Sequence, residues 1–312
     1  MKKPILSTPG EGEVQVVERQ SGWKSFLKSE FIHNYRHSVS AIFGSIIVLV
    51  VLFLAVFGPM LVTQNPYDLK DINLSDAFLP PIWQEGGDSR FPLGTDGQGR
   101  DMISVILYGS RTSLFIGVAV VVITCVVGTA LGVLSGYHGG RVDSFIMRLA
   151  DIQLSFPSML IALFIMAIFG RGIGKLIVTL SIVGWVIFAR TVRGETLSIK
   201  NKEYIEAARV MGYSNGKIIQ RHILPNVITS IIVIFTIRIG NVILTEATLS
   251  FLGVGVPVTQ PSLGLLVKNG FDVLFSGLWW VSVLPGLYIM IIVFGINLLG
   301  DFLKDELNPK LK

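Results

Sequence analysis

The sequence predicts an all-α membrane protein with about six transmembrane helices. Of its 312 residues, 51% are hydrophobic and only 15% are charged, whereas about 25% of the residues in a soluble domain are charged. The mean hydropathy is +0.65, and the apolar residues form uncharged runs of about 20 residues, the length that crosses a bilayer. A net charge of +5 is compatible with nucleic-acid binding, but the basic residues lie between these runs, so no nucleic-acid partner is expected.

The N-terminal part is expected to contain a polar tail and then a membrane-associated helix. Residues 1–22 are polar and contain prolines and glycines, which predicts a disordered cytoplasmic tail. In residues 23–37, apolar residues recur at helical spacing between basic ones. This pattern suits an amphipathic helix on the membrane surface, or a plain extension of the first span. The run Val39–Val62 is too long for a cleavable signal, so we expect it to remain as an anchor.

Six runs are apolar enough to be spans, and two of them are less regular than the others. Lys175 and Arg190 bracket the fourth, which is short, and the fifth contains charged residues. The predicted spans are Val39–Val62, Ser113–Tyr137, Ile152–Phe169, Ile173–Ala189, Val227–Leu252 and Trp280–Leu303. The predicted organisation is a tail (1–22), an amphipathic segment with the first span (23–62), an outer loop (63–112), a transmembrane domain (113–303) with an inner loop (195–225), and a tail (304–312).

The basic residues predict the orientation of the chain in the membrane. Most of the 26 lysines and arginines fall in the two tails and in the connections after the second and fourth spans, all on one side. The first loop on the other side is rich in aspartate and glutamate instead. Because basic residues accumulate in cytoplasmic segments, both termini are expected to be cytoplasmic.

The second span has a stripe of small residues on one helix face. Gly128, Gly132 and Gly136 recur every four residues, which favours the close approach of another helix, although glycine is also common in transmembrane helices generally. Cys125 is the only cysteine and lies in an apolar run. It is expected to be a small buried residue and not part of a disulfide or metal site.

The inner loop after the fourth span has the pattern of a helix–turn–helix elbow. Asn201 is a candidate N-cap, and Glu203 suits the positive start of a helix. Gly212 can end that helix with a left-handed turn. A second helix is expected to follow, and Pro225 suits the first turn of the next span.

The first helix of this elbow is a candidate docking element. Ala207 and Ala208 would leave a low surface on it, so that residues 206–212 form a knob for a groove on a partner protein. The alternative is an amphipathic connector that rests on lipid headgroups.

The spacing of the elbow motif resembles the EAA loop of ABC importer permeases. Glu206-Ala207-Ala208 is followed after three residues by Gly212, and after eleven more by Leu224-Pro225. The family often has isoleucine two residues before Leu-Pro, where this chain has His222. The resemblance implies that the loop docks into a cleft of an ATP-binding subunit and carries ATP-driven motion to the membrane helices. The predicted coupling residues are Glu203, Glu206, Ala207, Ala208, Gly212, Leu224 and Pro225.

A second resemblance narrows the branch of the family. Leu93–Asp101 with Gly109–Leu114 is similar to the segment before the second span of the C-type permease in dipeptide, oligopeptide and nickel importers. Glu246–Gly253 and Asn297–Asp305 are also similar to that branch, so the resemblance covers residues 30–312. It implies a type I ABC importer permease in the bacterial inner membrane.

That resemblance also implies partners and cargo. The expected partners are a second permease subunit, two ATP-binding subunits and an extracytoplasmic substrate-binding protein. ATP and Mg are expected on the ATP-binding subunits, with no cofactor or metal in this chain. The expected cargo is di- or oligopeptides, with nickel, glutathione or another small solute as alternatives.

The fifth span contains polar residues that need an explanation. A charge in the bilayer core costs at least about 2.5 kcal/mol, so Arg238 and Glu246 should not face lipid. They are expected either to line a water-filled pathway together with Asn241, or to contact another helix or the partner subunit. Eight residues correspond to about 12 Å of helix, so the two charges are not expected to pair. In the outer loop, Arg100 and Asp101 can pair with each other or cap a helix.

The motifs of several enzyme classes do not occur in the sequence. The segment Gly170–Lys175 has the wrong spacing for a nucleotide-binding loop, and no HExxH is present. We therefore expect no ATP binding and no catalysis by this chain. The rival hypothesis is a secondary transporter or channel without an ATPase, in which Arg238 and Glu246 act as coupling or selectivity groups. Co-purification of an ATPase subunit would distinguish the two.

Overall fold

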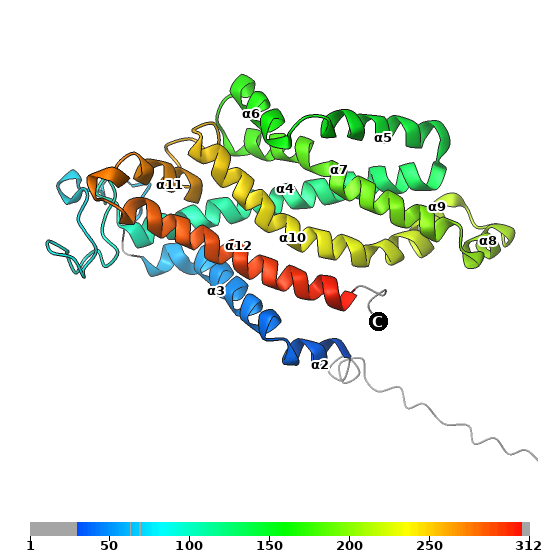
Figure 1. The fold of residues 1–312 in the computed structure, drawn as a ribbon, viewed down its shortest axis with the longest axis horizontal. Helices are drawn as coiled ribbons and strands as arrows, with labels where there is room; N and C mark the ends of the chain where they lie inside the picture. The colour runs from blue at the N-terminus through cyan, green and yellow to red at the C-terminus, as the bar shows by residue number, and fades with distance from the viewer. Residues whose placement is uncertain (1–29, 63, 69, 308–312) are drawn as a thin grey trace, which may run out of the picture.

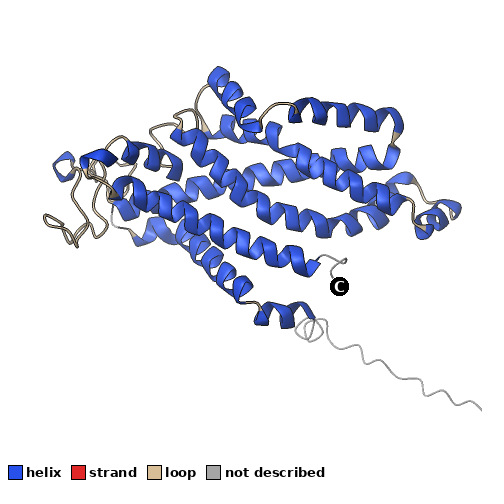
Figure 2. Cartoon of the chain, in the orientation of Figure 1, coloured by secondary structure: helices blue, strands red, loops and turns tan. Residues whose placement is uncertain are grey.

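The computed structural model describes residues 30–62, 64–68 and 70–307, and its regular secondary structure is helical (Figures 1 and 2). This part of the chain has one isolated β-bridge, Thr95 with Asp101, and no strand, which confirms the all-α prediction. The predicted tail of residues 1–22 lies outside the described residues. The helices are α2 (Glu30–His37), α3 (Val39–Leu61), α4 (Met102–His138), α5 (Gly140–Leu154), α6 (Ser158–Phe169), α7 (Ile173–Lys200), α8 (Glu203–Val210), α9 (Asn215–Ile218), α10 (Leu224–Phe251), α11 (Leu263–Phe271) and α12 (Trp280–Leu307).

The long helices α3, α4, α7, α10 and α12 run along the length of the molecule (Figure 1). One end of the bundle, here called the elbow end, carries α2, α8, α9 and the C-terminal end of α12. The opposite end, the loop end, carries the long connection before α4 and the short helix α11. Both described chain ends lie at the elbow end, as six crossings of a bilayer require.

Among the described residues, five helices are long and apolar enough to cross a membrane, and α5 with α6 would make a sixth span. The helix α4 begins at Met102, earlier than the predicted Ser113, because the Asp101 carboxylate caps it. Its Oδ2 accepts hydrogen bonds from the N–H of Ser104 at 2.8 Å and from the Ser104 hydroxyl at 2.7 Å. The predicted outer loop of residues 63–112 is therefore shorter, since its last part is the first three turns of α4.

The third predicted span, Ile152–Phe169, is not one continuous helix, since its residues belong to the end of α5 and to α6. The axes of α5 and α6 differ by 85°. Pro157 directly precedes α6, and a proline lacks the N–H needed to continue a helix and disfavours helical geometry in the residue before it. The chain therefore turns between the two segments.

The helices α4 and α7 pack through the predicted glycine stripe. A Cβ on Gly128 would lie 2.5 Å from the Phe188 Cβ, and one on Gly132 would lie 2.6 Å from the Ala189 carbonyl oxygen. Gly136 is equally close to α7. Because lipid tails are as apolar as leucine, helix association in a membrane depends on such close van der Waals contact.

Ion pairs fasten α5 to α7 near the elbow end. The Arg193 Nε and Nη2 lie 2.5 and 2.6 Å from the two carboxylate oxygens of Asp143, and Arg190 pairs with Asp151. The bidentate Arg193–Asp143 contact and the Arg190–Asp151 contact place opposite charges of α5 and α7 against each other.

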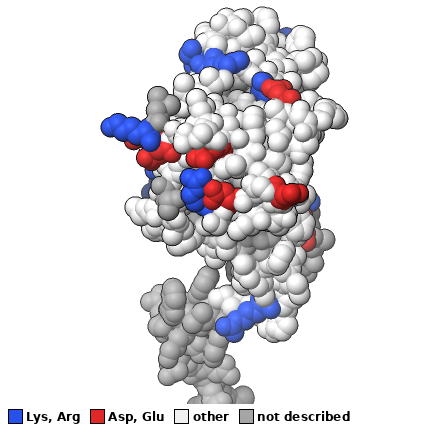
Figure 3. Space-filling view, turned by 90° about the vertical axis from the view of Figure 1, so that its left-hand side faces the viewer, with Lys and Arg blue, Asp and Glu red and all other residues white. Residues whose placement is uncertain are grey.

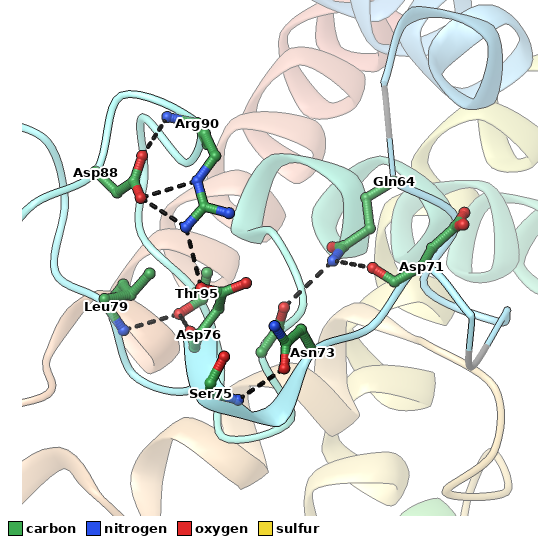
Figure 4. A network of polar contacts seen from close by, with 10 residues as sticks. Gln64, Asp71, Asn73, Ser75, Asp76, Leu79, Asp88, Arg90 and Thr95 are labelled. Carbon is green, nitrogen blue, oxygen red and sulfur yellow. Dashed lines mark hydrogen bonds and ion pairs between the residues drawn. The ribbon is translucent and has the colours of Figure 1, made fainter.

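The connection before α4 is folded by its own polar contacts (Figure 4). The Gln64 amide donates to the carbonyl oxygens of Asp71 at 2.9 Å and Gly99 at 3.3 Å, and its Oε1 accepts from the Asp101 N–H at 2.6 Å. The start and the end of this connection are thereby joined beside the first turn of α4.

Further contacts hold the same connection against the bundle. Arg100 pairs with Asp96 at 2.6 Å. Of the two alternatives for Arg100 and Asp101, the structure therefore has the helix cap, which Asp101 provides for α4. The Trp280 Nε1 donates to the Thr95 carbonyl at 3.1 Å and ties the loop to α12. Charged side chains of both signs are spread over this face (Figure 3).

The glycine stripe predicts a large effect of one added methyl group. Gly132→Ala should lower the free energy of unfolding by about 1–3 kcal/mol, because the new Cβ overpacks the α4–α7 contact. The measurement is the melting temperature of the purified chain in detergent. Gly194→Ala is the control, since Gly194 lies on α7 with no atom within 4 Å of its Cβ position. Equal melting temperatures for the two variants would contradict the packing role.

Candidate functional site

The predicted elbow is present at residues 201–223, between α7 and α10, and we call this segment the elbow. The predicted N-cap is wrong: Lys202 occupies the N-cap position of α8 with extended backbone, and no side chain caps the helix. The helix α7 continues to Lys200, so Asn201 serves as its C-cap residue. Glu203 and Glu206 lie in the first turn of α8, where negative charge is favourable.

Gly212 ends α8 as predicted, in the left-handed conformation with φ of 79°. The Gly212 N–H donates to the Arg209 carbonyl at 2.9 Å, and the Tyr213 N–H donates to the Ala208 carbonyl at 3.1 Å. This pair of hydrogen bonds is a Schellman motif, in which glycine has no steric cost. The bend between the two helices of the elbow is therefore a defined turn.

The inner face of α8 is buried in the protein. Ile205 and Ala208 have 0% and 1% of their surface exposed. They belong to an apolar cluster with Val133, Tyr137, Val192, Ile199, Ile218, Ile223 and Val227. The expectation that Ala207 and Ala208 together form a low outer surface is thus wrong for Ala208, which faces inward, while Ala207 is exposed.

The outer face of α8 carries an apolar tip that the sequence reasoning missed. Val210 is 89% exposed and Met211 is 66% exposed, next to the Gly212 turn. Glu203 and Glu206 are exposed as well. The available signal was helical periodicity, because Val210 and Met211 lie away from the face of Ile205. The arrangement is a short helix that is anchored on one side and offers two bare apolar side chains on the other.

Tyr137, at the end of α4, connects the elbow to the bundle. Its hydroxyl donates to the Asn215 Oδ1 at 2.8 Å, and its carbonyl accepts from the Lys200 Nζ at 2.5 Å. The guanidinium of Arg209 lies 5.9 Å from the centre of the Tyr137 ring, within the range of a cation–π contact. Tyr137 was not a predicted site residue, because nothing in its local pattern distinguishes it from other span-terminal residues.

The second half of the elbow runs directly into the fifth span. A π-helical turn at Ile219–Ile223 follows α9, and the Leu224 N–H donates to the Ile219 carbonyl five residues earlier. Pro225 lies in the first turn of α10 as predicted. Leu224 and Pro225 are exposed. α9, the π turn and α10 together form one helical run, Asn215–Phe251.

One face of α10 carries an exposed polar stripe at the depth of the span. Its members are spaced by three and four residues and lie within an arc of about 80°. Asn241 and Thr248 are exposed, and Arg238 and Thr245 are partly exposed. Among the described residues, the Arg238 guanidinium has no ion-pair partner, and its buried Nε has no hydrogen-bond acceptor. We call Arg238, Asn241, Thr245 and Thr248 the polar stripe.

Glu246 lies on a different face of α10, inside the protein. Its side chain is 0% exposed, and its carboxylate accepts hydrogen bonds from the hydroxyls of Ser113 at 2.8 Å and Ser250 at 2.7 Å. Of the two alternatives for Glu246, this geometry favours a structural partner on another helix. As expected, Glu246 and Arg238 do not pair.

The described residues contain no group of three or more His, Cys, Asp or Glu side chains arranged to hold a metal ion. The polar groups at the elbow and in α10 are suited to packing and hydrogen bonding. None of them forms a nucleophile with an adjacent base.

Comparisons with known proteins agree with this arrangement. The family described as binding-protein-dependent transport system inner membrane component matches residues 128–312, and the N-terminal TM domain of oligopeptide transport permease C matches residues 25–81. The oligopeptide transport system permease protein OppC of Bacillus subtilis (strain 168) is 36% identical over 100% of this chain and 97% of its own length. The di/tripeptide transport system permease protein DppC of Pseudomonas aeruginosa (strain UCBPP-PA14) is 38% identical over 91% of this chain and 92% of its own. The glutathione transport system permease protein GsiD of Pectobacterium atrosepticum is 39% identical over 91% of both chains.

The Schellman turn leads to a prediction about the elbow. Gly212→Ala forces a residue with a Cβ into the left-handed conformation, at a cost of about 1–2 kcal/mol. We expect the backbone amides of α8 to exchange with deuterium about 5- to 30-fold faster, measured by mass spectrometry. Gly216→Ala is the control, because Gly216 has negative φ and no atom within 4 Å of its Cβ position. If both variants exchange like the unmodified protein, Gly212 does not stabilise the elbow.

Proposed function

The chain belongs to the family of binding-protein-dependent transport system inner membrane components, and from this premise we propose that it is a membrane-spanning subunit of an ATP-driven importer of di- and oligopeptides. The relatives named for oligopeptides and for di/tripeptides support this cargo class. Glutathione, the cargo in the name of another relative, is itself a tripeptide and remains an alternative.

The observation that carries the coupling proposal is the exposed apolar tip of the elbow. Ile205 and Ala208 fix the inner face of α8 in the bundle, whereas most of the surface of Val210 and Met211 is exposed. An anchored helix with a bare apolar face fits the groove of a partner protein. In this proposal the partner is an ATP-binding subunit, and residues 203–212 form the docking surface.

The docking surface is rigidly linked to the membrane part. Tyr137 holds the elbow to α4, and the helical run from Asn215 to Phe251 continues it into α10. A displacement of the elbow by the closing ATP-binding subunits would therefore tilt or rotate α10. In this way energy from ATP hydrolysis in a separate subunit would change which side of the membrane the pathway faces.

The remaining subunits and the location follow from the same proposal. A second permease subunit would complete the pathway, two ATP-binding subunits would bind ATP and Mg at the elbow end, and an extracytoplasmic binding protein would deliver cargo to the loop end. The elbow end, with both described chain ends, would face the cytoplasm of a bacterial cell, as the basic residues near it favour. This chain would perform no catalysis.

The polar stripe of α10 is the proposed lining of the pathway. Arg238 and Asn241 offer a positive charge and an amide at a depth where lipid contact is costly. Peptides carry carboxylate and amide groups that such side chains can bind. Glu246 is not included, because its carboxylate is enclosed and hydrogen-bonded inside the chain.

The rival hypothesis is a secondary transporter or channel that uses no ATPase. It gives no role to the exposed tip of an elbow that is anchored on its other face. Family membership also favours the importer.

A charge on the elbow tip tests the docking proposal. Val210→Glu should prevent co-purification of the ATP-binding subunit, or reduce it about tenfold, because a carboxylate would be buried in an apolar groove. The same charge at Ser198, an exposed position near the end of α7, should leave co-purification unchanged. The measurement is the ratio of the subunits after affinity purification of this chain. Full assembly of the Val210→Glu complex would contradict docking at this surface.

A substitution in the polar stripe tests the pathway. Arg238→Gln should lower peptide uptake by reconstituted vesicles at least about fivefold, since a charged contact is worth about 1 kcal/mol or more, while the subunits still assemble. Thr236→Val is the control on the same helix, because the Thr236 hydroxyl bonds only to the Ile232 carbonyl of its own helix. Normal uptake by Arg238→Gln would show that this arginine does not line the path.

A further inference from the structure

Glu246 is the centre of a buried hydrogen-bond cluster that joins three separate elements. Its Oε2 accepts from the Ser113 hydroxyl of α4, and its Oε1 accepts from the Ser250 hydroxyl one turn further along α10. The Ser262 hydroxyl, directly before α11, interacts with the same carboxyl group. The two oxygens of a carboxyl group together have enough lone pairs to face all three hydroxyls, which a single alcohol or amide oxygen does not.

The cluster lies at the N-terminal end of α11. The Leu263 N–H donates to the Ser113 hydroxyl at 3.4 Å, and the Leu265 N–H donates to the Ser262 hydroxyl at 3.2 Å. These contacts occupy N–H groups that no residue within the helix can pair. The carboxylate of α10 therefore stabilises the position of the first turn of α11.

Two glycines fix α11 against its neighbours without intervening side chains. A Cβ on Gly264 would lie 2.3 Å from the Ala247 carbonyl oxygen of α10, and one on Gly270 would lie 2.3 Å from the Ser282 backbone nitrogen of α12. Backbones in such contact cannot slide past one another without losing it. The position of α11 thus depends directly on that of α10.

The outer surface that α11 supports is apolar and exposed. Phe275, in the turn after α11, is 91% exposed, and Phe271 at its end is 47% exposed. This surface lies at the loop end, at the opposite end of the bundle from the elbow (Figure 1). One helical run, Asn215–Phe251, connects the elbow to the Glu246 cluster.

We propose that Glu246 is a positioning residue that makes α11 follow α10, so that a displacement of the elbow reaches the surface of Phe271 and Phe275 at the loop end. Glu246 does not contact cargo in this role. The inference rests on the proposed function, because it takes the elbow as the place where ATP-driven motion enters the chain.

Three variants separate the role of the carboxylate from its size and polarity. Glu246→Ala leaves the three serine hydroxyls without their common acceptor. Glu246→Gln keeps the shape and one acceptor oxygen, and the hydroxyls can rotate to meet the new amide. Ser262→Ala removes the link between Glu246 and the segment before α11 together with the N-cap bond to Leu265, and it serves as the second test if the Glu246→Ala complex does not assemble.

The first readout is ATP hydrolysis by the complete reconstituted complex, with and without cargo-loaded binding protein. We expect Glu246→Ala to lose about fivefold to tenfold of the stimulation by the binding protein, within the usual range of coupling between distant sites. Glu246→Gln should restore most of it, and Ser262→Ala should lie between them. Unchanged stimulation in both Glu246→Ala and Ser262→Ala would overturn the proposal. An altered KM for cargo with normal stimulation would also overturn it, because that result assigns Glu246 to cargo contact.

The second readout does not require transport. Spin labels at Phe275→Cys and Trp83→Cys, both exposed positions at the loop end, report the distance between the α11 surface and the preceding loop, in a chain whose Cys125 is replaced by alanine. ATP should change this distance in the parent complex and change it much less in Ser262→Ala and Glu246→Ala. An equal ATP-dependent change in all three would refute the link. If the parent complex imports no peptide, the cargo proposal fails, and the labels still decide the role of Glu246.

Discussion

The close contact between α4 and α7 determines where the groups at the elbow end lie. Gly128, Gly132 and Gly136 bring the two backbones together over several turns, and any side chain on that stripe would separate them. Because the helices stay together to their ends, Tyr137 lies beside Lys200 and can bind Asn215 of the elbow. The anchor of the elbow is thus a consequence of packing deep within the bundle, where lipid offers no hydrophobic drive for association.

The fold and the elbow were predictable because they depend on local signals. Long uncharged runs predict the spans, and a glycine after a short amphipathic helix predicts its Schellman turn. The break before Pro157 was missed because the apolar run continues through it, and hydropathy does not record the backbone hydrogen bond that proline removes. Which alanine of the elbow faces inward depends on the tertiary contacts of Ile218 and Val227, which local spacing does not reveal. Asn201 was a sound N-cap by type, but the extension of α7 to Lys200 left it at the wrong helix end.

The polar residues of the fifth span illustrate the same limit. The energetic cost of a charge in lipid predicts that Arg238 and Glu246 avoid lipid contact. The sequence alone does not show that their environments differ. The structure separates them by about two turns and by face: Glu246 is enclosed by serines of other elements, and Arg238 remains partly exposed without an acidic partner in the described chain. Ser113 and Ser262 come from positions far from Glu246 in the sequence, so only the three-dimensional arrangement identifies them as its partners.

The π-helical turn at Ile219–Ile223 sets the phase between the elbow and the fifth span. Ile218 and Ile223 are five residues apart and both are 0% exposed, whereas five residues of α-helix would place them about 140° apart. The wider turn contains one additional residue and brings both onto the inner side. If all five residues adopted ordinary α-helical geometry, the elbow would rotate by roughly 100° relative to the lateral surfaces of α10, whereas deleting one residue would leave Ile218 and Ile223 about 40° apart and preserve the phase. The rotational registry between the two ends of the molecule therefore depends on the width of this one turn.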